Sequence, residues 1–237
     1  MKSDFAELDY GLFAEKYPIF QEFQQAVAGP ILRHYLKLGT QRKLNILEIG
    51  SGEGATTSEI LTLVPNSKIV CVDTDSVLIN SAKKRLKGYP NSIAFLNEDI
   101  FSYLPQIEDN YFDVIASCYV IHNFEETQRR ILLKDIYSKL KTGGLFVNGD
   151  NYALDDNQKQ FRACMWTVKQ LIKMYEDPAL QYKWTKHRFR DEQIKWTKNN
   201  AFSDFKESGF INVSETYRSK DKIGRLLIES VIVGKKD

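Results

Sequence analysis

Between residues 44 and 150, short apolar runs alternate with stretches whose apolar positions recur at helical spacing. The runs are rich in Val, Ile and Leu without polar alternation, which is typical of strands covered on both faces. Strands that alternate with helices form βαβ units and a parallel sheet, so we predict a doubly wound α/β fold. The predicted strands are 44–49, 68–73, 93–96, 112–117 and 144–148, and the predicted helices are 56–63, 76–87 and 125–140.

The N-terminal segment, residues 1–43, is predicted to form helices packed on the sheet edge, with Pro18 at the start of the second helix. Its aromatic residues recur at helical spacing, which is more typical of a core-facing helix than of a cofactor site. These residues are Tyr10, Phe13, Tyr17, Phe20 and Phe23.

Two segments follow the βα repeat. Residues 151–208 are far longer than a crossover of about 10–12 residues, so we expect extra helices that form a lid. Residues 209–237 hold two alternating runs, 210–217 and 225–233, which predict an antiparallel hairpin at the end of the sheet. We therefore predict one domain over residues 1–237, with a core, a helical N-terminal extension, a lid insertion and a C-terminal hairpin.

Composition and charge argue against several function classes. The net charge of +2 predicts no strong attraction to nucleic acid or to an anionic membrane. No run approaches the ~18 apolar residues of a membrane-spanning helix, and the N-terminus lacks the apolar stretch of a signal peptide. The three cysteines form no C-x-x-C pair. We expect a cytoplasmic protein, monomeric or homodimeric, with no cluster of metal ligands.

The sharpest chemical signal is a glycine-rich turn between the first predicted strand and helix, with the sequence LEIGSGEG at 47–54. Glycines allow a tight turn and let the backbone approach a ligand that a Cβ would repel. The following helix N-terminus offers free N–H groups to an anion. Asp73 lies about 20 residues further on, at the end of the next strand, where an acid can accept both hydroxyls of a ribose. The pattern predicts a nucleotide-type ligand.

A nicotinamide dinucleotide is the main competing ligand, because Gly50, Gly52 and Ala55 satisfy G-x-G-x-x-(G/A). Three features count against a dehydrogenase. Glu48 precedes the first glycine by two residues, the sheet is predicted to end in an antiparallel hairpin, and no Tyr-x-x-x-Lys pair follows the fifth strand.

The motif EIGSGEG at 48–54 resembles the first motif, (D/E)-x-G-x-G-x-G, of class I S-adenosylmethionine-dependent methyltransferases. The resemblance implies a Rossmann-like fold and S-adenosylmethionine as cofactor, but it is not specific for the substrate. It covers about residues 44–150 and 205–233. The further matching segments are VDTD at 72–75, NEDI at 97–100, FDVI at 112–115, LKTGG at 140–144 and Gly209-Phe210.

The resemblance implies a role for each motif residue. Asp73 would take the ribose hydroxyls, and Asp99 would accept from the adenine amine. Asp99 is also a good N-cap for a short helix, and both interpretations stay open. The implied cofactor-binding residues are Glu48, Gly50, Ser51, Gly52, Asp73, Thr74, Asp99, Ile100, Cys118 and Tyr119.

His122 is the candidate general base, because it follows the fourth strand at the edge where open α/β sheets bind ligands. The alternative is a histidine that flanks a helix start, where Asn123 would be the N-cap. Aromatic and histidine side chains outside the motifs are candidates for the acceptor site, since aromatic faces stabilise a cation. These candidates are Tyr10, Tyr17, Tyr152, Trp184 and His187.

The predicted function is methyl transfer from S-adenosylmethionine to a small molecule. One alternative keeps the cofactor but changes the chemistry, as in carboxy-S-adenosylmethionine synthase, which the segment before Gly209 faintly resembles. A second is methylation of RNA, because basic and aromatic residues mix over 183–198. The third is a cofactor-binding accessory subunit without activity of its own.

Overall fold

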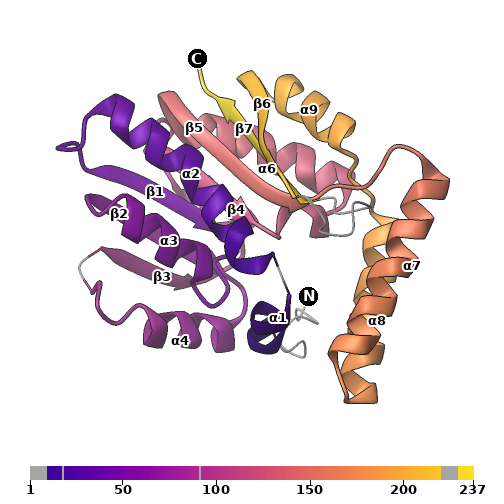
Figure 1. Cartoon of the computed structure of the whole chain (residues 1–237). Helices are drawn as coiled ribbons and strands as arrows, with labels where there is room; N and C mark the ends of the chain where they lie inside the picture. The colour runs from indigo at the N-terminus through magenta and orange to yellow at the C-terminus, as the bar shows by residue number, and fades with distance from the viewer. Residues whose placement is uncertain (1–9, 18, 91, 220–228) are drawn as a thin grey trace.

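A mixed sheet of seven strands runs through the middle of the molecule in the order β3-β2-β1-β4-β5-β7-β6 (Figure 1). The computed structural model describes residues 10–17, 19–90, 92–219 and 229–237. Strands β1 to β5 pair in parallel, whereas β7 runs antiparallel to both β5 and β6. This arrangement confirms the predicted fold class. The strands are β1 Leu44–Ile49, β2 Ser67–Asp73, β3 Ile93–Asn97, β4 Phe112–Cys118, β5 Leu140–Asn151, β6 Ile211–Arg218 and β7 Glu229–Lys235.

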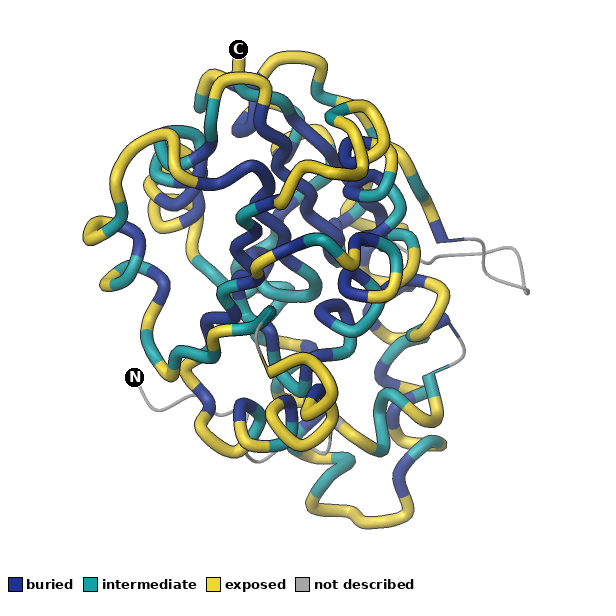
Figure 2. Tube along the Cα trace, turned by 90° about the vertical axis from the view of Figure 1, so that its left-hand side faces the viewer, coloured by how far each residue is buried: buried dark blue, intermediate teal, exposed yellow. Residues whose placement is uncertain are grey.

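Helices cover both faces of the sheet, because successive strand residues point to opposite sides and both sets are apolar. Ile46 joins the core under α2 and α3, whereas its neighbour Leu47 joins the core under α6 and α9. Figure 2 shows the buried residues gathered along the central strands, with exposed residues on the outer turns. The helices are α1 Tyr10–Lys16, α2 Phe20–Leu38, α3 Ala55–Leu63, α4 Ser76–Arg85, α5 Ile100–Tyr103, α6 Glu126–Lys139, α7 Asn157–Met174, α8 Pro178–Gln193 and α9 Lys198–Glu207, with 3₁₀ turns η2 Leu104–Gln106 and η3 Ile121–Asn123.

The strand order reverses at β1, because β2 and β3 lie on one side of it and β4 and β5 on the other. Open α/β sheets bind ligands at the carboxyl ends of the strands beside such a reversal. Ile49 pairs with Ser117 there, so the segments that follow β1 and β4 leave the sheet side by side. The fold thereby brings the glycine turn, Asp73 and His122 to one edge.

The helices α7 and α8 form a pair that stands beside the sheet (Figure 1). Trp184 on α8 and Tyr175, which follows α7, contact Phe13 of α1 in a separate apolar cluster. The predicted lid segment also contains α9, but α9 covers the sheet, where Phe205 stacks on Phe146 at 5.1 Å between ring centroids. Within the described residues, no helix combines the length and apolar character needed to cross a bilayer.

Several local predictions are wrong. β5 begins at Leu140 and not at 144, so residues 140–143 belong to the strand, and Gly143 among them has φ +76°. Asn123 is not the N-cap of α6, because Glu125 caps that helix in a capping box with Gln128. The Asn123 amide instead donates to two carbonyls of its own turn.

The aromatic stripe of the N-terminal segment only partly fits the prediction of a core-facing helix. Phe23 of α2 is fully buried in the core. The helix is interrupted at Tyr17, however, and Phe13, Tyr17 and Phe20 line a cavity beside the sheet.

Candidate active site

The glycine turn after β1 has a shape that only glycine accommodates. Gly50 has φ +66°, and a Cβ there would lie 2.2 Å from Cγ2 of Val120. Gly52 has φ +50°, and its N–H donates to Oδ2 of Asp73 over 2.8 Å. The turn therefore lies against Val120, which follows β4, and is tied to the end of β2 by the Gly52–Asp73 hydrogen bond, as a turn that approaches a ligand requires.

Glu48 lies beneath this turn and is absent from the residues that line the cavity. Its carboxyl group is 1% exposed and accepts a hydrogen bond from the Thr57 hydroxyl. Burial raises its pKa to about 7, while the Thr57 hydrogen bond acts in the opposite direction. Glu48 thus supports the turn from below, and the cofactor contact that the resemblance implies for it stays a prediction.

Asp73 ends β2 at the cavity, and Asp75 follows it as the N-cap of α4. Oδ1 of Asp73 accepts from the Asp75 N–H over 2.9 Å, and burial raises the Asp73 pKa. Asp75 caps α4 by accepting from Val77 and Leu78 through Oδ1. Its Oδ2 is buried and makes no hydrogen bond to any described residue. Such an atom is satisfied by a ligand or water donor.

Asp99 and Ile100 stand at the neighbouring edge, after β3. Asp99 is the N-cap of α5 and accepts from the Phe101 N–H over 2.9 Å. It is also exposed toward the cavity, which Ile100 lines as well. The cap and the ligand interpretation are therefore compatible, because a carboxylate oxygen that caps a helix leaves the other oxygen available.

One cavity of about 1050 Å³ connects the glycine turn, the ends of β2 and β4, and the lid helices. Ligand pockets commonly have volumes of about 300–1,000 Å³, so this space suits a nucleoside-sized ligand together with a small second molecule. Its walls include Phe13 and Trp184, whose rings stack at 5.0 Å between centroids.

At the far end of the cavity, His122 is held by Asp150. The main-chain N–H of His122 donates to Oδ2 of Asp150 over 3.0 Å, and Nδ1 of the ring is hydrogen-bonded to Oδ1. Burial lowers the His122 pKa, but the Asp150 carboxylate raises it, and the net shift is upward. Asp150 is fully buried. The pair fixes the ring and leaves Nε2 as the nitrogen for other contacts.

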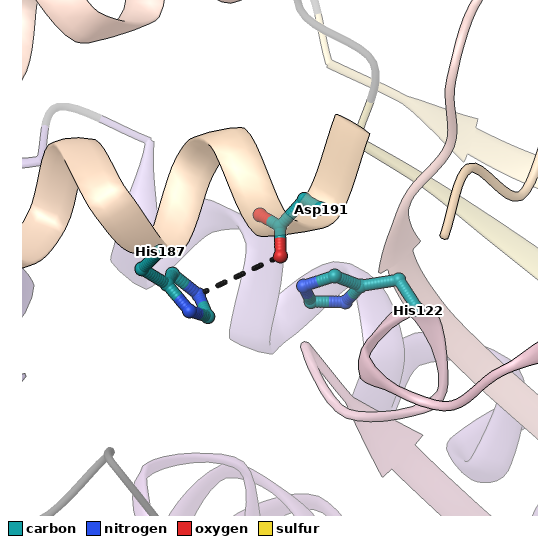
Figure 3. A group of neighbouring side chains, drawn as sticks. All are labelled: His122, His187 and Asp191. Carbon is teal, nitrogen blue, oxygen red and sulfur yellow. Dashed lines mark ion pairs between the residues drawn. The ribbon is translucent and has the colours of Figure 1, made fainter. Parts of the chain in front are cut away.

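The lid helix α8 brings His187 and Asp191 to the same end (Figure 3), and Arg188 of this helix lines the cavity as well. Nε2 of His187 lies 3.9 Å from Oδ1 of Asp191, and these two groups and His122 offer ligating atoms that all lie within 4.8 Å of one another. Arg188 pairs with Oδ2 of Asp191 at 3.3 Å. The expectation of no cluster of metal ligands is therefore wrong. The sequence does not reveal the cluster, because its residues meet only in the folded chain.

A second polar group lines the cavity at the start of β7. Glu229 is 3% exposed and accepts hydrogen bonds from the hydroxyls of Tyr17 and Ser219. Burial raises its pKa, and the Tyr17 hydrogen bond opposes that effect. Glu229 also raises the pKa of Tyr119, after the larger effect of burial.

Residues 46–144 match the family model of a methyltransferase domain. Together with the glycine turn, Asp73 and the strand order, this match identifies the domain. Residues 46–144 form a class I S-adenosylmethionine-dependent methyltransferase domain. S-adenosylmethionine is the cofactor of this family.

Similar proteins include several methyltransferases. Malonyl-(acyl-carrier protein) O-methyltransferase 1 of Ilyobacter polytropus is 34% identical over 131 residues, which are 55% of this chain and 46% of that protein. Carboxy-S-adenosyl-L-methionine synthase of Nautilia profundicola is 21% identical over 73% of this chain and 72% of its own length. The CurJ carbon methyltransferase structure superposes with a TM-score of 0.66 at 19% identity, over 98% of this chain and 57% of that one. The chain thus spans about half the length of the first and third of these proteins.

The methyltransferase cofactor fits the residues that are present. The cradle at Gly50 leaves no room for a Cβ, and the buried hydroxyl of Ser51 and Oδ2 of Asp75 make no hydrogen bonds to described residues. All three positions line the cavity. A ligand with hydroxyl and ammonium donors and a carboxylate acceptor satisfies such groups.

The cavity brings together most of the sequence-predicted site. Its lining contains Gly50, Ser51, Gly52, Asp73, Thr74, Asp99, Ile100, Cys118, Tyr119, His122, Tyr17, Trp184 and His187. Tyr152 is 2% exposed, is absent from the lining, and packs on Trp196 in the core. The structure places Tyr152 outside this cavity, and its predicted acceptor role stays a prediction. Tyr10 begins α1, but its side chain lies outside the described residues.

Sequence reasoning missed Arg188, Asp191 and Glu229 as residues of the site. Glu229 opens a strand of alternating character, where an acid looks like a solvent-facing position. Arg188 and Asp191 lie in a charged helix, whose residues are more often solvated. The spacing of Asp191 four residues after His187 was the available signal, because it puts both on one helix face.

Proposed function

We propose that the chain transfers a methyl group from S-adenosylmethionine to a small-molecule acceptor held under the α7–α8 lid. One observation carries this proposal: a single cavity runs from the glycine turn and Asp73 to His122 and α8. Methyl donor and acceptor must share a space in which their reacting atoms can be aligned, and such positioning supplies about 7–11 kcal/mol of the barrier reduction.

The proposed cofactor end consists of the glycine turn, Asp73 and the Asp99–Ile100 edge. Asp73 has a second lone pair on each oxygen after accepting from Gly52 and Asp75, so it can accept from ribose hydroxyls. Ile100 is apolar and largely buried at the cavity wall, where an adenine ring can pack. When bound there, the cofactor supplies an electrophilic methyl group on a sulfonium.

The proposed acceptor end is enclosed by aromatic side chains. Phe13 stacks on Tyr17 at 4.7 Å and on Trp184 at 5.0 Å between centroids, which joins α1 to the lid. These rings exclude water and stabilise positive charge by about 0.5–2 kcal/mol each. His122 remains the predicted catalytic residue, because its Nε2 is the atom available for a base or for a ligand of a cation.

A second candidate function is a different transfer reaction on the same cofactor. The match to carboxy-S-adenosyl-L-methionine synthase extends over 180 residues. Arg188 lines the cavity, is 7% exposed, and has a buried Nε without a hydrogen bond to described residues. A buried guanidinium is suited to a carboxylate of the second substrate. A carboxylated cofactor retained by the purified protein, seen by mass spectrometry, would favour this candidate.

The test is transfer of a radiolabelled methyl group from S-adenosylmethionine into fractions of a cell extract. We expect label in the small-molecule fraction with the wild-type chain and none with Asp73→Ala. Label in the RNA fraction instead would show that the acceptor is RNA and not a small molecule. Tight cofactor binding without any transfer would support an accessory subunit and contradict the proposal.

A further inference from the structure

We propose that His122, His187 and Asp191 bind a divalent transition-metal ion at the acceptor end of the cavity. Figure 3 shows the two imidazole rings and the carboxylate turned toward a common point between η3 and α8. Two histidine nitrogens and one carboxylate oxygen form a ligand set that first-row divalent ions accept, with positions left open for another molecule.

The backbone geometry suits this set. His187 and Asp191 stand four residues apart on α8, so their side chains project from one face of the helix. Nε2 of His187 and Oδ1 of Asp191 are 3.9 Å apart, and all three ligating atoms lie within 4.8 Å. Ligands about 2.0–2.2 Å from an ion lie about 3.0–3.5 Å from one another, so rotamer changes of about 1 Å close the site.

Asp150 supplies the support that a metal-binding histidine needs. It occupies Nδ1 of His122 and accepts from the main-chain N–H of the same residue. This leaves Nε2 for the ion and fixes the orientation of the ring. A carboxylate behind a ligating histidine is the usual partner in metal sites, and it raises the basicity of the imidazole.

The carboxylate of Asp191 gives the strongest indication of a ligand. Its side chain is 9% exposed, and its Oδ1 is buried without a hydrogen bond to any described residue. Arg188 pairs with the other oxygen and with Glu192 at 3.4 Å. A buried carboxylate oxygen is costly unless it is paired, and a cation beside two imidazoles satisfies it.

A bound ion would join the lid to the core, because two ligands come from α8 and one from η3. Its open positions would face the cavity, where an acceptor oxygen can bind and have its pKa lowered. His122 would then be a ligand and not the general base. The binding of an acceptor oxygen by the ion rests on the proposed function. The binding of the ion itself does not.

The experiment uses the full chain without a histidine tag, freed of metal with a chelator. It is titrated with ZnCl₂ by calorimetry and with CoCl₂ by visible absorption, which reports the coordination of the ion. We expect one ion per chain. His187→Gln and Asp191→Asn should weaken binding by at least about 100-fold, and Asp150→Asn by about 10–100-fold. His34→Gln, which changes the histidine outside the cluster, should bind like wild type.

S-adenosylhomocysteine is titrated into the same samples. Unchanged binding of S-adenosylhomocysteine shows that each variant is folded. The same titration separates the two proposals, because a wild-type chain that does not bind S-adenosylhomocysteine would contradict the proposed function and leave the metal site untouched. No ion binding up to millimolar concentration would overturn the metal site. Equal binding by wild type and the two ligand variants would place the ion elsewhere and would also overturn it.

Discussion

At the scale of single residues, the site depends on backbone positions that exclude a side chain. Gly50 combines a positive φ with contact to Val120, so its conformation and its surroundings both require glycine. Gly39 also has a positive φ of +92°, but a Cβ there would meet no atom within 4 Å. Substitution of Gly39 therefore tests backbone strain alone, whereas substitution of Gly50 tests strain together with the clash against Val120.

Gly50→Ala should weaken S-adenosylhomocysteine binding by at least about tenfold, because a clash of this kind forces the turn away from β4. Gly39→Ala should lose stability through strain but keep its affinity. Calorimetric titration and thermal unfolding of both variants check this. Equal affinity in the Gly50 variant and wild type would contradict the proposed role of the turn.

Glu48 should make stability depend on pH. Its folded pKa of about 7 lies above the usual 4.5, so the folded state holds the proton more tightly than the unfolded chain. Stability is therefore lost as pH rises from about 4.5 to about 7, by up to about 3 kcal/mol. Glu48→Gln should gain stability relative to wild type between pH 5 and 8.

Urea unfolding at pH 5 and at pH 8 measures the difference in unfolding free energy between Glu48→Gln and wild type. Glu108→Gln, at an exposed glutamate, is the control and should follow wild type. A Glu48 variant whose stability parallels wild type at both pH values would show that the buried carboxyl carries no proton linkage.

At the scale of elements, Asp113 ties three segments together at the end of the strands away from the site. It is 2% exposed and accepts from the Asn45 N–H, from Arg42 and from Lys141, each over 2.9 Å. Asp113→Ala leaves these donors without their acceptor and should cost about 2–4 kcal/mol.

Because Asp113 is remote from the cavity, cofactor affinity should not change with its substitution. Asp109→Ala, which breaks an exposed pair with Lys139, is the matched control and should leave unfolding unchanged. Equal stability of the two variants in urea would contradict the role assigned to Asp113.

The lid depends on Trp184, which joins α8 to α1 and α7. Its ring stacks on Phe13 at 5.0 Å and on Tyr175 at 5.9 Å. Trp184→Ala removes a buried aromatic side chain, a change that typically costs about 3–5 kcal/mol, and this loss should fall on the lid. Limited proteolysis should therefore cut the α7–α8 segment faster.

Tyr182→Ala on the same helix is the control, since Tyr182 is 70% exposed. It should be cleaved at the wild-type rate. If Trp184→Ala resists cleavage as well as wild type does, the lid is held by other contacts.

At the scale of the whole molecule, the sheet could be predicted from sequence because buried parallel strands leave uninterrupted apolar runs. The glycine turn and Asp73 could be predicted because their spacing is local. His122 and His187 could be named as candidates from the sequence, but their meeting with Asp191 could not, because distant segments supply these residues and only the fold brings them together. The burial of Tyr152 and Glu48 could not be predicted, since a sequence does not reveal whether a polar group faces a cavity or the core.

The most direct test of the central claim is calorimetric titration of S-adenosylhomocysteine and NAD into wild type and Asp73→Ala. The structure predicts micromolar binding of the sulfur ligand by wild type, weakened by at least about tenfold in the variant because the ribose acceptor is lost. NAD should not bind. Tight NAD binding without S-adenosylhomocysteine binding would contradict the account, as would equal S-adenosylhomocysteine affinity in the two proteins.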